Sequence, residues 1–275
     1  MNYMFNEGEI VLKLYVGFIK NSVQRVITYR TNVWAKTLGK FLYLYVQVSV
    51  WIALYESNNI SQNMRGLQQI ILYVVINNLL SCLVEFNAID LLNQKIKTGD
   101  IALDLMKPFN YMLYIFCYGL GDIIINVCFQ AVPMLLFSMI FWGFSIAEYS
   151  LILIFICSAM LSIVISFLFA YFIGILAFWF LVTWPINMAT RAIYKIMSGV
   201  WIPIWLFPGF LKKISLCLPF QSIYYAPAFI LSQPVLDKVE TIRLIEGQFV
   251  WIVIMGGIVN VAWHCGRKKL VIQGG

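Results

Sequence analysis

The chain has 275 residues, of which 62% are hydrophobic and 11% are charged, and its formal net charge is +7. A soluble domain carries about 25% charged residues, and a chain of this size cannot hide so much apolar surface from water. The composition therefore excludes a soluble globular protein and predicts an all-α polytopic membrane protein. Loops that set membrane orientation and meet anionic lipid are typically basic, so we expect membrane lipids and no nucleic acid as partners.

The first residues lack a basic segment followed by an apolar one, so we expect no cleaved signal and a cytosolic start. In residues 9–30, Lys13 and Lys20 fall on one side of a helical wheel, and Tyr15 and Ile19 fall on the other. This pattern predicts an amphipathic helix that lies in the membrane interface. A helix packed on a soluble partner is the alternative.

Six apolar segments follow, so we expect six transmembrane helices: 33–55, 67–89, 109–143, 150–183, one that starts near Ile196, and 249–265. The third and fourth exceed the ~20 residues that a bilayer requires, so they should extend, tilt or break. Gly119 and Gly121 are candidate breaks, and Pro133 is a candidate kink.

Residues 203–234 contain five prolines and remain apolar, which excludes one long helix. We expect short re-entrant helices between spans five and six, packed against protein in the outer leaflet. No repeat or low-complexity linker divides the chain, so residues 1–275 are predicted to form one transmembrane domain.

With the N-terminus inside, the six spans place both termini in the cytosol. Fourteen of the 19 Lys and Arg residues then lie on the cytosolic side, which agrees with the positive-inside rule.

A polar loop, residues 91–108, interrupts the apolar sequence between spans two and three. Gly99 can end the helix that leaves span two, and Asp100 can cap a second short helix that ends before Pro108. Asp100 and Asp104 share one face of that helix, beside an apolar stripe of Ile101 and Leu105. We expect the helix to dock on a cytosolic partner, with an ordinary lipid-surface loop as the alternative.

Catalytic and cofactor motifs are absent from the sequence. It has no phosphate-binding loop, no H-E-x-x-H and no G-x-S-x-G. Its single histidine, His264, and its scattered cysteines fit no metal site or disulfide framework. We expect no catalytic, cofactor-binding or metal-binding residues, and ATP could be bound only by a partner chain.

Three carboxylates lie in or beside apolar segments: Glu85, Asp90 and Asp122. Acids at membrane depth are candidates for proton or cation relays. The alternative is that they pair with Lys95, Lys97 or Lys107 at the interface, or cap a helix.

The chain resembles the permease subunit of bacterial ABC-2-type transporters over nearly its whole length. The resemblance combines the N-terminal helix, the six spans, residues 97–108, the segments 198–203, 206–208 and 218–220, and the tail 271–275. It implies a non-catalytic exporter subunit in the bacterial cytoplasmic membrane. Its partners would be a cytosolic ABC ATPase dimer and a second permease, identical or paralogous.

The resemblance also implies that the 91–108 loop couples the permease to the ATPase. The candidate coupling residues are Lys97, Gly99, Asp100, Ile101, Asp104 and Leu105. Substrates of such exporters are amphipathic, in the lipid, peptide or antibiotic classes. The alternative functions are an ATP-independent channel or proton-coupled carrier that uses Glu85 or Asp122, and an intramembrane enzyme.

Overall fold

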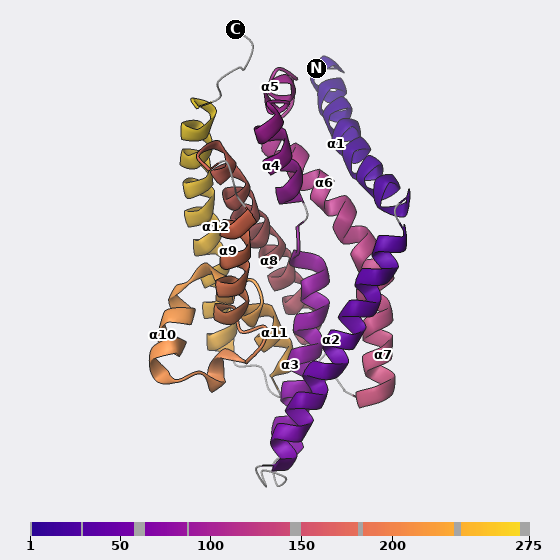
Figure 1. The fold of residues 1–275 in the computed structure, drawn as a ribbon, viewed down its shortest axis with the longest axis vertical. Coiled ribbons are helices and arrows are strands. Elements are labelled where there is room, and N and C mark those ends of the chain that lie inside the picture. Colours follow the sequence, from indigo (N-terminus) through magenta and orange to yellow (C-terminus); the bar gives the residue numbers. More distant parts are fainter. Residues whose placement is uncertain are drawn as a thin grey trace.

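The structure is a computed structural model that describes residues 2–28, 30–57, 64–86, 88–143, 150–180, 184–233 and 238–269. Every regular element in these ranges is a helix, and none of them is a strand. The long helices run side by side along the long axis of the molecule (Figure 1). The prediction of an all-α polytopic membrane protein is confirmed.

The α-helices of the described residues, in chain order, are α1 (Asn2–Thr28), α2 (Arg30–Ser57), α3 (Met64–Val84), α4 (Ala88–Thr98), α5 (Ile101–Leu105), α6 (Tyr111–Asn126), α7 (Val132–Trp142), α8 (Ser150–Ile175), α9 (Trp184–Met197), α10 (Gly209–Cys217), α11 (Tyr225–Ser232) and α12 (Lys238–Arg267). A π-helical turn, η2 (Val127–Ala131), joins α6 to α7. Three 3-10 turns complete the described elements: η3 (Leu176–Phe178), η4 (Ile204–Leu206) and η5 (Pro219–Ser222).

Five helical segments in the described ranges are long and apolar enough to cross a membrane: Thr31–Ser57, Gly66–Val84, Tyr111–Trp142, Leu151–Phe178 and Lys238–Arg267. They correspond to predicted spans one to four and six. The predicted start of span five near Ile196 is wrong, because α9 ends at Met197 and Gly199 follows with a φ of +81°. α9 has 14 residues, fewer than the ~20 needed to cross a bilayer, so the count of six spans remains a prediction.

The third span is irregular near Pro133 but not at the two glycines that were also predicted. α6 continues through Gly119 and Gly121, so these glycines do not break it. The irregularity is the π-helical turn η2, which immediately precedes the turn that contains Pro133. Proline lacks an amide hydrogen and crowds the preceding turn of a helix, and a π-bulge is one way to accommodate it. The predicted kink near Pro133 therefore coincides with a real change in helix type.

The proline-rich segment after α9 folds into short helices that start at or next to its prolines. η4 follows Pro203, α10 follows Pro208, η5 begins at Pro219, and Pro227 lies in the first turn of α11. Proline is tolerated there because the first amides of a helix have no intrahelical partner. Pro234 lies outside the described residues, and insertion of the segment into the outer leaflet remains a prediction.

The core lies where α3, α8 and α11 pack together. Tyr73, Ile165 and Tyr224 are among its largest fully buried side chains. A polar cluster ties α8 to α12 and η5. Gln248 accepts a hydrogen bond from Ser158 Oγ (2.9 Å) and donates one to the carbonyl oxygen of Ser222 (2.8 Å). Buried amides need such partners, so this cluster fixes the position of α12 against α8.

The two ends of the molecule differ. The start of α1, the end of α12 and the helices α4 and α5 lie together at one end (Figure 1). α10 and α11 lie in the opposite half, beside the lower parts of α3 and α12. The 91–108 loop therefore shares an end of the bundle with the parts of the chain nearest to its two termini.

Candidate functional site

The 91–108 loop turns at a glycine, as the sequence predicted. α4 ends at Thr98, and Gly99 has a φ of +79°, a left-handed conformation that suits glycine. The Gly99 amide donates a hydrogen bond to the Ile96 carbonyl oxygen (3.3 Å), which closes the helix end. Lys97, Thr98 and Gly99 are exposed, so this turn is accessible from solution.

Asp100 does not cap α5, so that prediction is wrong. Its backbone is already helical (φ −61°, ψ −20°), and its side chain makes no capping hydrogen bond to α5. A helical backbone at this position does not have the extended geometry that the capping residue normally adopts. Instead, the Asp100 carboxylate accepts a hydrogen bond from Thr98 Oγ1 (2.7 Å) and remains exposed.

The other predicted loop residues attach α5 to the rest of the protein. Ile101 is fully buried in the main core, and Leu105 packs partly buried against the same core. Asp104 is buried and pairs with both Lys95 of α4 and Lys107, with Lys107 Nζ 2.7 Å from its carboxylate. These residues attach α5 to α4 and to the bundle, so they fix its position rather than form its outer surface.

The ion pairs of Asp104 also determine its titration. Burial alone would raise the pKa of Asp104, but hydrogen bonds and charges from Lys107 and Lys95 lower it below its ordinary value. Burial alone would lower the pKa of Lys95, but Asp104 and Tyr114 raise it. Both groups are therefore charged at neutral pH.

Leu103 and Met106 form the exposed apolar surface of α5 and the turn that follows it. Their side chains are 65% and 84% exposed, respectively. The sequence analysis missed them because it assigned the apolar stripe to Ile101 and Leu105, which the structure buries. The signal was present, since positions 103 and 106 are three apart and share a helix face.

α1 docks on α6 through small residues and one partly buried ion pair. A Cβ atom on Gly121 would lie 2.5 Å from Ser22 Cβ and 2.8 Å from the Ile19 carbonyl oxygen, so only glycine allows this approach. Asp122 is buried there, with Arg25 Nη2 at 2.6 Å and Ser22 Oγ at 3.0 Å. The predicted pairing of Asp122 with lysines of the 91–108 loop is wrong, because α1 provides its partner.

α1 also contacts the two residues that immediately follow the 91–108 loop. The hydroxyl of Tyr15 accepts a hydrogen bond from the Asn110 amide (3.2 Å), and the ring of Phe18 packs edge-on against Phe109 (5.5 Å between centroids). In Figure 1, α1 runs obliquely along the bundle beside α6. The loop, α1 and α6 therefore form one connected group of elements.

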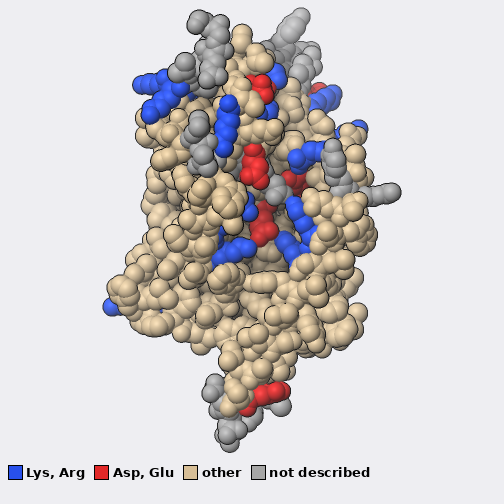
Figure 2. Space-filling view, viewed as in Figure 1, with Lys and Arg blue, Asp and Glu red and all other residues tan. Residues whose placement is uncertain are grey.

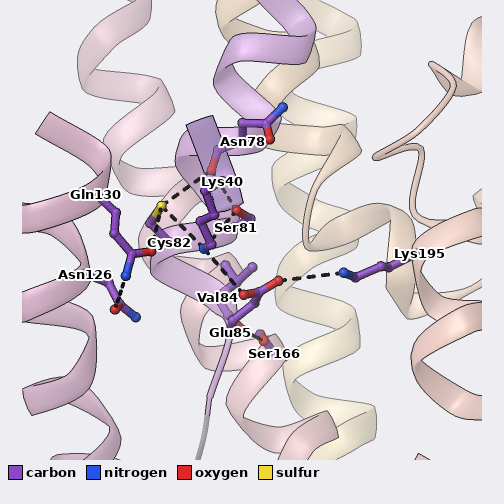
Figure 3. A network of polar contacts seen from close by, with 10 residues as sticks. All are labelled: Lys40, Asn78, Ser81, Cys82, Val84, Glu85, Asn126, Gln130, Ser166 and Lys195. Carbon is purple, nitrogen blue, oxygen red and sulfur yellow. Dashed lines mark hydrogen bonds and ion pairs between the residues drawn. The ribbon is translucent and has the colours of Figure 1, made fainter. Parts of the chain in front are cut away.

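Glu85 lies at the junction of three helices (Figure 3). It immediately follows α3, and its carboxylate lies 3.4 Å from Lys40 Nζ of α2 and 3.9 Å from Lys195 Nζ of α9. Lys40 also donates a hydrogen bond to Ser81 Oγ (3.2 Å). The predicted partners of Glu85 in the 91–108 loop are wrong, because Lys40 and Lys195 occupy that role.

These groups line a cavity between α2, α3 and α9 that we call the basic crevice. Its volume is about 420 Å³, and its polar lining includes Lys36, Lys40, Asn77, Glu85, Arg191 and Lys195. An adjoining cavity next to α1 is lined by Asp90 and Asp122 together with Arg25 and Lys36. Figure 2 shows charged side chains of both signs gathered in a hollow on this face of the molecule.

The cations of α9 were also missed by the sequence analysis. Asn187, Arg191 and Lys195 recur every four residues, a spacing that places them on one helix face. The expected start of span five near Ile196 obscured this pattern. Within the described residues, no group of three or more His, Cys, Asp or Glu side chains could hold a metal ion.

Comparison with known proteins adds a family relationship. The family model described as ABC-2 family transporter protein matches residues 41–274 of this chain. No curated protein sequence matches the chain. The matched region begins within α2, after Lys36 and Lys40, and includes the 91–108 loop, the other charged residues of the basic crevice and the proline-rich segment.

Proposed function

Because the chain belongs to the ABC-2 transporter family, we propose that it is the permease subunit of an ATP-binding cassette exporter, powered by a separate ATPase. In this proposal the subunit moves an amphipathic substrate out of the cell. The observation that carries the proposal is the exposed apolar pair Leu103 and Met106. The pair lies on and just after a short helix that is held in place by the ion pairs of Asp104. Exposed apolar side chains on a rigid support are typical of protein docking sites.

The bracing supports a mechanical role for α5. The buried side chain of Ile101 joins α5 to the core, and Asp104 joins it to α4 through Lys95. Lys95 Nζ also lies 5.1 Å from the centre of the Tyr114 ring of α6. A displacement of Leu103 or Met106 would therefore be transmitted to α4, α6 and α1 through packed contacts.

The remaining parts of the proposal follow the family expectation. The 91–108 loop faces the cytosol and meets one ATPase of a dimer, and a second permease completes the transport path. α2 presents exposed apolar residues that could face lipid or that second subunit, including Leu38 (64%) and Leu42 (68%). The bacterial cytoplasmic membrane is the proposed location, with both termini in the cytosol.

The docking proposal can be tested by co-purification of the full-length chain with a candidate ABC ATPase. The double substitution Leu103→Gln, Met106→Gln removes the exposed apolar pair and leaves Ile101 and Asp104 in place. Burial of each such side chain contributes about 1.5–3 kcal/mol, and 1.4 kcal/mol corresponds to tenfold in affinity. We expect the double variant to bind the ATPase at least tenfold more weakly.

The matched control is Phe210→Gln. Phe210 is 78% exposed, and its helix, α10, lies in the opposite half of the bundle. The substitution should leave ATPase binding unchanged. Equal binding by wild type and by the Leu103→Gln, Met106→Gln variant would show that α5 is not the docking surface.

A further inference from the structure

The basic crevice carries an excess of positive charge. Four basic side chains line it, Lys36 and Lys40 from α2 and Arg191 and Lys195 from α9, whereas Glu85 is the single acid among its described lining residues. Asp90 and Asp122 lie in the adjoining cavity, where Arg25 already pairs with Asp122. Since cations gathered in a concave site attract anions strongly, the crevice is suited to a negatively charged ligand.

The orientation of α9 supports this interpretation. Its polar residues Asn187, Arg191 and Lys195 line the two cavities next to α9, while Arg191 and Lys195 stay partly exposed. Its apolar residues Trp184 (68% exposed) and Met188 (54%) point outward. Charged residues among membrane helices commonly face a water-filled cavity and mark substrate pathways. The polar face of α9 therefore forms one wall of the crevice.

Glu85 is a weak counter-ion for these cations. Its distances to Lys40 (3.4 Å) and Lys195 (3.9 Å) exceed the 2.7–2.9 Å typical of strong charge-assisted hydrogen bonds. The side chain is also 44% exposed. The ion pair between Arg25 and the buried carboxylate of Asp122, at 2.6 Å, shows a tight contact in the same molecule. An anion that enters the crevice could therefore replace Glu85 on Lys195 at little cost.

Two further features favour an amphiphile over a small ion. The crevice wall contains Asn77, which is fully buried and whose amide atoms have no hydrogen-bond partner among the described residues. Arg191, Lys195 and Glu85 also line a second cavity of about 100 Å³, whose wall includes Phe169 and Ile173. Arg191 and Lys195 thus lie between a polar cavity and a cavity with apolar lining residues.

We propose that the basic crevice binds the acidic head group of an amphiphilic substrate, and that this head group displaces Glu85 from Lys195. The inference rests on the proposed transport function and specifies its substrate class. Arg191 and Lys195 bind the head group, and the apolar part of the substrate lies toward Phe169 and Ile173. Neutral and cationic amphiphiles lack the charge that these side chains recognise.

The test uses the purified full-length chain in dodecyl maltoside, without an ATPase. Thermal unfolding is followed by tryptophan fluorescence while dodecyl phosphate, dodecyltrimethylammonium or inorganic phosphate is added. Dodecyl phosphate should raise the unfolding temperature in a saturable way, whereas the cationic amphiphile should not. Inorganic phosphate should act only at concentrations at least tenfold higher, and equal potency of the two phosphates would overturn the assignment to an amphiphile.

Variants identify the site. Arg191→Gln with Lys195→Gln should weaken dodecyl phosphate binding at least tenfold, whereas Lys212→Gln with Lys213→Gln in α10 removes the same charge elsewhere and should change nothing. Glu85→Gln removes the competing carboxylate and should tighten binding. Unchanged binding in the Arg191, Lys195 variant, or weaker binding in Glu85→Gln, would overturn the proposal.

The result is independent of ATPase docking. The Leu103→Gln, Met106→Gln variant should bind dodecyl phosphate like wild type even though it fails to bind the ATPase. Absence of dodecyl phosphate binding by the wild-type chain would overturn the crevice proposal and leave the docking proposal standing. ATPase binding by the Leu103→Gln, Met106→Gln variant would overturn the docking proposal only.

Discussion

At the level of single residues, Asp104 and Glu85 show how burial distinguishes two carboxylates that both pair with lysines. Asp104 has a side chain that is 10% exposed and holds Lys95 and Lys107 closely. Glu85 is 44% exposed and keeps its lysines at 3.4 and 3.9 Å. Asp104 therefore maintains the shape of the 91–108 loop, whereas Glu85 is free to exchange partners.

Asp104→Asn should loosen α5. The substitution removes the charge that Lys95 and Lys107 share, and a partly buried group left without its partner costs about 1–3 kcal/mol. We expect the α5 amides to exchange hydrogen for deuterium roughly tenfold faster. Asp100→Asn is the control, because Asp100 is exposed and bonds only locally to Thr98. Equal exchange in both variants would contradict the bracing role of Asp104.

The ion pairs of Asp104 with Lys95 and Lys107 also predict that the stability of the protein depends on pH in the acidic range. Ion pairing lowers the pKa of Asp104 in the folded protein, so its stabilisation is complete above the ordinary Asp pKa of about 3.9. That stabilisation is lost as the pH falls through the lower, folded value. The unfolding temperatures of wild type and Asp104→Asn, distinct at pH 7, should therefore converge as the pH falls below about 3.9. A constant difference would contradict this account.

Some of these residue roles could be predicted from sequence and others could not. Gly99 was identifiable as a helix terminator, because a glycine after a helical pattern is a strong local signal. The roles of Asp100 and Asp104 were not separable, because both are four-spaced acids on one short helix. The structure distinguishes them, because Asp104 is buried and pairs with Lys95, nine residues earlier on α4, whereas Asp100 stays exposed.

Among the elements, α1 depends on the close approach that Gly121 permits. Gly121→Leu would place side-chain atoms where Ser22 and the Ile19 carbonyl lie, so it should separate α1 from α6. A fluorophore attached to α1 should become more mobile, and ATPase docking through the nearby loop should weaken. Gly39→Leu in α2, where a Cβ would meet nothing within 4 Å, is the matched control. An immobile α1 in Gly121→Leu would refute this packing.

The turn between α4 and α5 gives a second prediction at this scale. Gly99 has open space around a Cβ position, so the effect of Gly99→Ala comes only from its left-handed backbone. That conformation costs an alanine about 1–2 kcal/mol, and the unfolding temperature should fall accordingly. Gly17→Ala, in a helical and uncrowded position, should be neutral or stabilising. A neutral Gly99→Ala would mean that the turn is not held as described.

Element boundaries were predictable wherever the signal was local. Long apolar segments identified five spans, and clustered prolines identified the short helices after α9. α9 was missed because its 14 residues mix cations with apolar residues, which resembles neither a span nor a loop in sequence. The role of its polar face becomes clear only from the structure, in which α2, α3 and α9 together line the basic crevice.

For the molecule as a whole, the two proposed sites lie along one side of the bundle. The 91–108 loop is at the end shared with the start of α1, and the basic crevice lies between α2, α3 and α9 below it (Figures 1 and 2). Glu85 lies six residues before the 91–108 loop in the sequence. Movement of α5 and α4 would therefore act directly on the edge of the crevice.

The central claim is that an ABC ATPase drives this chain through contact with α5. The most direct measurement is photo-crosslinking with benzoylphenylalanine introduced in place of Met106, in the full-length chain co-expressed with a candidate ABC ATPase. The account predicts a covalent adduct with the ATPase from position 106 and none from the same probe in place of Phe210. An adduct from position 210, or none from position 106 in a complex that still assembles, would contradict it.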